Sequence, residues 1–222
     1  MKKLVELARA TVPGGKEMVL YRRNCDFVVH VDGRELMGSR AHASEERLAT
    51  LGCAGMESTP GARVLIGGLG MGFTLRAALR KLGDDARVDV AELVPSVTHW
   101  NHTHLAHLAG APLLDSRVRV IECDVFDVLR QADATYDAIL LDVDNGPHAL
   151  SAPANARLYD ANGLARSKRA LRAGGTLAVW STSDDPKFTD RLTRAGFTAR
   201  IERPVGRVGG SARHVLFIAR KA

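Results

Sequence analysis

The sequence lacks several features that define other classes of protein. No stretch approaches the ~20 consecutive apolar residues that a membrane-spanning helix needs, and residues 1–9 lack the apolar core of a signal peptide. The three cysteines, Cys25, Cys53 and Cys123, match no zinc-binding spacing. Neither a G-x-x-x-x-G-K-[ST] phosphate loop nor a G-x-S-x-G nucleophile motif occurs. We therefore expect a cytoplasmic protein with reduced thiols and no membrane segment.

Large blocks of one charge are also missing. The net charge is +6, from 31 basic and 25 acidic residues, and a basic surface is one sign of nucleic-acid binding. However, acidic residues are interspersed with the basic ones, and no run of five Lys or Arg occurs. The alternative is a basic surface spread along the whole chain. We therefore expect a small-molecule acceptor, and neither nucleic acid nor a membrane, as the partner.

The first part of the chain has short strand-like segments. Residues 18–21 and 27–31 flank a plausible hairpin turn, and Asp32-Gly33 is a second turn signal. Ser44 then has the residue type of a helix N-cap, and the predicted helix runs to about residue 53. Residues 1–58 are thus predicted to form a small cap of β-hairpin and helix.

From residue 59 to residue 222, short apolar strands alternate with helical segments. The predicted strands are 64–66, 88–91, 118–121, 138–141 and 177–180, and the predicted helices are 73–82, 95–108, 125–132, 155–172 and 186–195. Such alternation indicates a parallel sheet covered on both faces. Segments 197–202 and 215–219 have no helix between them and predict an antiparallel final hairpin. The expected fold is α/β and Rossmann-like, with a mostly parallel seven-stranded sheet.

A glycine-rich loop follows the first parallel strand. Gly67, Gly68, Gly70 and Gly72 lie between this strand and the next helix, where glycine lets a ligand approach the backbone and the helix N-terminus presents its amides. Their G-x-G-x-G spacing is typical of S-adenosyl sites and does not match the dinucleotide fingerprint. We predict a site for S-adenosylmethionine or its decarboxylated form. The alternative is a turn that holds no ligand.

Two acids follow the next two strands. Glu92 comes 20 residues after Gly72, where a carboxylate can accept hydrogen bonds from ribose hydroxyls; the alternative is an acid that caps the next helix. Asp124 follows the third strand and can accept from the adenine amino group, a role compatible with capping its own helix. We place Val125 beside it in the same cofactor-binding set.

Asp142 and Asp144 follow the fourth strand. Because ligands of open α/β sheets bind at the carboxyl ends of the strands, we expect both carboxylates to face the reactive sulfonium. Asp142 can orient or deprotonate an attacking amine or hydroxyl; the alternative is that it holds a water or caps a loop. His148, beside the same loop, is a candidate for proton transfer.

Four histidines, His99, His102, His104 and His107, suggest a metal site at first sight. His99 and His102 can share a helix face, but no acid nearby completes a zinc constellation. We expect a solvated helix and no bound metal.

Taken together, Gly67–Gly72, Glu92, Asp124 and the run from Tyr136 to Asp142 resemble the spermidine synthase family, and so does the stretch from Leu158 to Leu177. The similarity covers roughly residues 16–182. The resemblance implies a Rossmann-like domain of the class I methyltransferase type behind a small β-domain, and a homodimer. It also implies aminopropyl transfer from decarboxylated S-adenosylmethionine to a polyamine, with Glu92 on the ribose, Asp124 on the adenine and Asp142 as the base.

The chain departs from the family in its glycine loop. The family loop reads roughly G-G-G-D-G-G, and its acid pairs with the amine of the aminopropyl arm; here Gly70 falls at or beside that place. The loop after Asp142 is also shorter. Since an acid would repel the carboxylate of intact S-adenosylmethionine, our leading interpretation is an S-adenosylmethionine-dependent methyltransferase. The alternatives are aminopropyl transfer and a non-catalytic S-adenosyl-binding protein.

Overall fold

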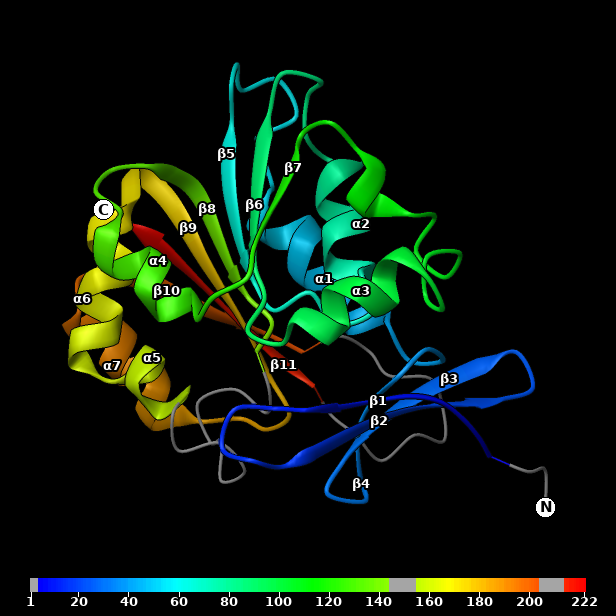
Figure 1. Cartoon of the computed structure of the whole chain (residues 1–222). Helices are drawn as coiled ribbons and strands as arrows, with labels where there is room; N and C mark the ends of the chain where they lie inside the picture. The colour runs from blue at the N-terminus through cyan, green and yellow to red at the C-terminus, as the bar shows by residue number, and fades with distance from the viewer. Residues whose placement is uncertain (1–3, 144–154, 204–213) are drawn as a thin grey trace.

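The computed structural model describes residues 4–143, 155–203 and 214–222 and contains two sheets. The smaller sheet is antiparallel, in the order β1-β2-β3-β4 (Figure 1). Its strands are β1 (Val5–Thr11), β2 (Glu17–Arg23), β3 (Asp26–Val31) and β4 (Arg34–Gly38). The predicted hairpins are therefore confirmed. Strand β1 was not predicted, although Pro13-Gly14-Gly15 after it is a turn signal, because its residues mix charged and apolar types.

The larger sheet has the order β10-β11-β9-β8-β5-β6-β7. Its strands are β5 (Arg63–Gly67), β6 (Arg87–Ala91), β7 (Val118–Ile121), β8 (Tyr136–Leu141), β9 (Leu171–Ser181), β10 (Phe197–Glu202) and β11 (Val215–Lys221). Strands β7, β6, β5, β8 and β9 run parallel, and β11 and β10 complete the edge in antiparallel pairing. The predicted fold class, including the final antiparallel hairpin, is confirmed.

Helices cover both faces of this sheet, as the alternating sequence pattern predicted (Figure 1). The helices are α1 (Ala43–Gly52), α2 (Phe73–Leu79), α3 (Pro95–His102), α4 (Val125–Gln131), α5 (Ala156–Tyr159), α6 (Ala161–Ala170) and α7 (Pro186–Arg194), with a short 3₁₀ turn at Pro112–Leu114. Helices α1, α2 and α3 pack on one face, and α4 to α7 pack on the other.

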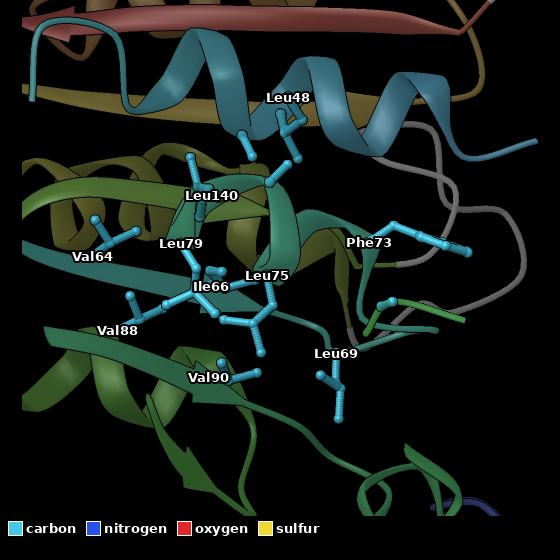
Figure 2. Close-up of a cluster of buried hydrophobic side chains, with 14 of the residues drawn as sticks. Leu48, Val64, Ile66, Leu69, Phe73, Leu75, Leu79, Val88, Val90 and Leu140 are labelled. Atoms are coloured by element: carbon cyan, nitrogen blue, oxygen red, sulfur yellow. The ribbon is translucent and has the colours of Figure 1, made fainter. Parts of the chain in front are cut away.

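The two faces receive alternate side chains of each buried strand. In β5, Val64 and Ile66 point to the cluster under α1 and α2, whereas Leu65 points to the opposite cluster (Figure 2). In β8, Leu140 lies in the first cluster with Leu48 of α1. This period of two explains why these strands read as continuous apolar runs: both of their faces are buried. The result is a sheet buried on both faces, and the loops after β5, β6, β7 and β8 lie at its carboxyl edge.

The smaller sheet packs onto the same cluster through one of its faces, which includes Leu20, Phe27 and Val29. In Figure 1 it lies beneath the larger sheet. Met37 of β4 brings its sulfur to within 3.7 Å of where a Cβ on Gly70 would lie. The small sheet therefore borders the glycine loop. The predicted division of the chain at 58/59 stays a prediction.

Two local predictions were wrong. Ser44 is not an N-cap: the N-cap position is two residues earlier, at His42, which makes no capping hydrogen bond. The single helix predicted over 155–172 is two helices, because Asp160 caps α6 by accepting from Gly163 N at 2.8 Å. After α6, Gly174 and Gly175 lie in an irregular part of β9, where Gly174 has φ +70°.

Helix α3 is also shorter than the predicted 95–108, since it ends at His102 and turns follow. Within the described ranges, none of the helices has the length and apolar character required to cross a membrane.

Candidate active site at the carboxyl edge of the sheet

The glycine loop is fastened to the strands on both sides of β5. Gly68 N donates to Ala91 O of β6, and Asp142 N donates to Gly67 O beyond the end of β8, each at 2.9 Å. Gly68 has φ +88°, and a Cβ there would lie 2.4 Å from the backbone oxygen of Asp142. Only glycine fits this position, since both the backbone angle and the space exclude a side chain. Glycine at this position thus lets the backbone of the loop pack directly against the backbone at Asp142.

Two buried polar side chains hold the rest of the loop. Glu92 accepts from Leu69 N through one carboxylate oxygen and from Val94 N through the other, both at 2.8 Å. Asn101 of α3 donates to Gly70 O at 2.8 Å and to Val97 O at 2.9 Å. Glu92 therefore positions the loop, while its predicted ribose contact stays a prediction. Asn101 was missed, because nothing in its local sequence separates it from the neighbouring polar residues of the helix.

The last two glycines of the loop differ in their surroundings. Gly72 is the N-cap of α2 with φ +82°, and a Cβ there would crowd Asn101, Pro112 and Ala109 at 3.2–3.3 Å. Gly70 has φ +53° and open space around it, since the nearest atom to a Cβ is the sulfur of Met37. Gly70 is therefore the least crowded glycine of the loop, with β4 of the small sheet as its neighbour.

Asp124 lies at the end of β7, where one carboxylate oxygen caps α4 by accepting from Phe126 N at 2.8 Å. The other oxygen accepts from Arg157 at 2.7 Å. The capping alternative is confirmed, and the adenine role, which is compatible with it, stays a prediction. Val125 is buried against Gly67, its Cγ2 lying 2.9 Å from where a Cβ on that glycine would be.

Leu93 is a further residue of this edge that the sequence analysis did not single out. It directly follows Glu92 and is 43% exposed, which is unusual among the large apolar residues of the described chain. The sequence signal that could have identified Leu93 was its position directly after Glu92, the acid at the end of a predicted strand. An exposed apolar side chain beside the glycine loop offers a face on which a flat ring can stack.

Asp142 comes directly after β8 and is half-buried. Burial, followed by the negative charge of Glu45, raises its pKa to about 7, and a hydrogen bond of 2.5 Å from Thr74 acts in the opposite direction. A carboxyl group with a pKa near 7 can exchange a proton with a ligand at neutral pH. Asp144 and His148, the other predicted catalytic residues, lie outside the described residues.

The strand ends therefore bring most of the predicted residues to one edge of the sheet. This edge combines a glycine loop with space at Gly70, two strand-end carboxylates, an exposed leucine and a half-buried acid with a pKa of about 7. These groups suit a nucleoside with hydroxyl and amino groups, because carboxylates accept from such donors and the leucine can cover a ring.

The remaining candidates lie elsewhere. His99, His102, His104 and His107 are exposed, and in the described part of the chain no three His, Cys, Asp or Glu side chains gather as a metal site would require. Cys123 is half-buried, and burial raises its pKa.

Comparison with known proteins connects this site to one family. A family model described as the spermine/spermidine synthase domain matches residues 42–193. Polyamine aminopropyltransferase 1 of Streptomyces coelicolor is 35% identical over 128 residues, which make up 57% of this chain and 23% of that protein. The polyamine aminopropyltransferase of Oceanobacillus iheyensis is 29% identical over 162 residues, 71% of this chain and 30% of that protein. The chain thus spans less than a third of the length of both relatives.

Solved structures show the same fold. Spermidine synthase of Thermotoga maritima superposes with a TM-score of 0.79 at 18% identity, covering 100% of this chain and 75% of that one. A spermidine synthase in complex with the transition-state analogue AdoDATO gives a TM-score of 0.76 at 17% identity, with coverage of 100% and 74%. A probable spermidine synthase of Corynebacterium glutamicum gives 0.66 at 15% identity, with coverage of 99% and 81%.

Proposed function

Because the chain belongs to the spermine/spermidine synthase family, we propose that it transfers an aminopropyl group from decarboxylated S-adenosylmethionine to an amine of a polyamine. The observation that carries this proposal is the family match over residues 42–193, a range that runs from α1 through the glycine loop to α7. The names of two relatives and the AdoDATO-bound neighbour support the same donor and acceptor classes.

The residues at the carboxyl edge support this donor. Glu92 and Asp124 carry carboxylates at the ends of β6 and β7, where a ribose and an adenine would be held in neighbouring positions. Gly67, Gly68 and Gly72 let the backbone between them and the start of α2 pack closely on its neighbours, and Gly70 leaves space at the turn. We assign the ribose hydroxyls to Glu92, the adenine amino group to Asp124 and an apolar wall to Leu93 and Val125.

The chemistry of the step is a single displacement. When bound, the donor supplies a carbon activated by attachment to a sulfonium: a bond forms from the acceptor nitrogen to this carbon as its bond to sulfur breaks, and the electron pair stays on the sulfur. Asp142 takes the proton that the nitrogen loses, which its pKa near 7 allows at neutral pH. The protein's main contribution is to hold the two reactants aligned.

Methyl transfer, the leading interpretation of the sequence alone, is now the second candidate. The observation that favours it is Gly70, because the loop carries no acid that would disfavour the carboxylate of intact S-adenosylmethionine. The family match and the curated relatives favour aminopropyl transfer instead. A homodimer and a cytoplasmic location belong to the same proposal and can be tested by light scattering and by fractionation.

A turnover assay tests the proposed function. The purified protein is incubated with decarboxylated S-adenosylmethionine and a panel of linear diamines, and the release of 5′-methylthioadenosine is followed by chromatography. We expect release that depends on a diamine and falls at least 100-fold in Asp142→Asn, since general acid–base catalysis contributes typically 10²–10⁴-fold. No release with any diamine would contradict the proposal.

A further inference from the structure

Two neighbouring acids in the first turn of α1 have different surroundings. Glu46 contacts Arg76 of α2 and lies 3.2 Å from Nδ1 of His42. Glu45, by contrast, receives a hydrogen bond of 2.6 Å from the hydroxyl of Ser44, and no Lys, Arg or His of the described chain lies within ion-pair distance of it. Glu46 therefore forms ion pairs within the protein, whereas the half-buried Glu45 forms none with the described residues.

Glu45 lies at the junction of α1, the glycine loop and the end of β8. Thr74, two residues beyond Gly72, connects these elements: its hydroxyl lies 2.5 Å from Oδ2 of Asp142 and 3.5 Å from the backbone oxygen of Glu45. Helices α1 and α2 pack side by side around this point. The charge of Glu45 is also close enough to raise the pKa of Asp142. The proposed base and a second carboxylate thus share one corner of the site.

Two carboxylates in one partly buried place repel each other, and a cation between or beside them relieves the repulsion. The described residues supply no such cation to Glu45. Residues 67–72 of the glycine loop carry no acid either, since they are Gly, Gly, Leu, Gly, Met and Gly. For an ammonium group that enters beside the loop, the carboxylate of Glu45 on α1 is therefore a candidate partner, since no ion pair of the described chain engages it.

We propose that Glu45 is the residue that pairs with the terminal ammonium of the aminopropyl arm and thereby selects the decarboxylated donor. This inference rests on the proposed function and adds the basis of its specificity. The same charge would face the carboxylate of intact S-adenosylmethionine and disfavour it. Donor selection then depends on the first turn of α1, and a loop without an acid is compatible with aminopropyl transfer.

Titration calorimetry of wild type and Glu45→Gln with three ligands tests this role. The ligands are decarboxylated S-adenosylmethionine, intact S-adenosylmethionine and 5′-methylthioadenosine, which has no arm. We expect Glu45→Gln to weaken the decarboxylated donor by roughly 10- to 100-fold, the usual range for a lost charged hydrogen bond. The affinity for 5′-methylthioadenosine stays unchanged, which also shows that the variant is folded, and the affinity for intact S-adenosylmethionine does not fall.

Two further variants sharpen the comparison. Glu45→Asp keeps the charge on a shorter side chain and should retain part of the preference for the decarboxylated donor. Glu57→Gln removes an exposed carboxylate that lies beyond the far end of α1, near Lys81, and should change none of the three affinities.

The outcomes separate the two proposals. If wild type prefers the decarboxylated donor and Glu45→Gln keeps that preference, the role of Glu45 is wrong and the proposed function stands. If Glu45→Gln weakens 5′-methylthioadenosine as much as the decarboxylated donor, Glu45 shapes the whole site and does not recognise the arm. If wild type binds none of the three ligands, both proposals are wrong.

Discussion

The carboxylate of Glu92 accepts a hydrogen bond of 2.8 Å from the backbone amide of Leu69, in the middle of the glycine loop. Its other oxygen accepts from Val94 N, in the loop that leads into α3. A strand-end acid that was expected to bind a ligand therefore also fixes the loop that would bind the same ligand. Any change at Glu92 should affect both the stability of the loop and the affinity for the donor.

Glu92→Gln should make this coupling measurable. The amide has only one acceptor oxygen, so one of the two backbone amides faces an NH₂ group and loses its partner. We expect the free energy of unfolding to fall by ~1–3 kcal/mol, the cost of leaving a buried donor unsatisfied, and donor affinity to fall with it. Chemical denaturation and calorimetry measure the two effects. Glu122→Gln, at an exposed position beyond β7, is the control, and equal behaviour of the two variants would refute the role of Glu92.

The glycine loop allows a test with two matched substitutions. Gly68→Ala places a Cβ 2.4 Å from the backbone oxygen of Asp142 at φ +88°, whereas Gly70→Ala makes only an ordinary contact with the sulfur of Met37 at φ +53°. We expect a loss of roughly 2–4 kcal/mol in the first variant, from strain and overlap together. The second should lose about 1 kcal/mol, from the backbone angle alone. Thermal or urea denaturation ranks them, and equal losses would mean that the loop is not held as described.

The raised pKa of Asp142 predicts a specific dependence of stability on pH. In the unfolded chain this carboxyl has its ordinary pKa of 3.8, and in the folded protein the pKa is about 7. Between these values the folded state binds more protons, so the contribution of Asp142 to the free energy of unfolding falls as the pH rises. Asn has no such charge, so Asp142→Asn should gain stability relative to wild type from pH 4 to 8, by at most ~4 kcal/mol.

Denaturation of wild type and Asp142→Asn across this pH range is the measurement. A constant difference between the two proteins would show that Asp142 is ionised with an ordinary pKa. Glu45→Gln should lower the pKa of Asp142, because the negative charge of Glu45 is one of the causes that raise this pKa.

Asp124 and Arg157 form an ion pair whose two members should behave differently on truncation. Asp124→Ala removes the N-cap of α4 and should cost about 1 kcal/mol of stability, with weaker donor binding. Arg157→Ala removes a side chain that is 46% exposed, so the loss should stay below about 1 kcal/mol, and donor affinity should not fall. If Arg157→Ala weakens the donor, Arg157 itself contacts the ligand and the assignment of adenine to Asp124 needs revision.

Much of the fold was predictable because the buried strands and their helices carry local signals. The apolar runs at β5, β6 and β8 reflect burial on both faces. The antiparallel hairpin was predicted because the sequence has no helical pattern between segments 197–202 and 215–219. Most of the candidate site was also predictable, since Gly68, Glu92 and Asp142 each follow a predicted strand at the same edge.

The rest depended on contacts between distant elements, which no local pattern encodes. Asn101 reaches Gly70 from another helix, and Thr74 joins Asp142 to α1. Glu45 looked like an ordinary acid of a first helical turn, because its nearness to Asp142 appears only when α1 packs beside α2. The leading interpretation of the donor rested on Gly70, which was visible in the sequence, whereas the nearness of Glu45 to Asp142 was not.

The most direct test of the account is a competition between the two donors in one reaction. Decarboxylated and intact S-adenosylmethionine are supplied at equal concentration with a linear diamine, and mass spectrometry identifies the group that the diamine gains. We predict that the diamine carries an aminopropyl group. A methylated product with no aminopropyl product would contradict the proposed function. It would support the interpretation that Gly70 allows intact S-adenosylmethionine to bind.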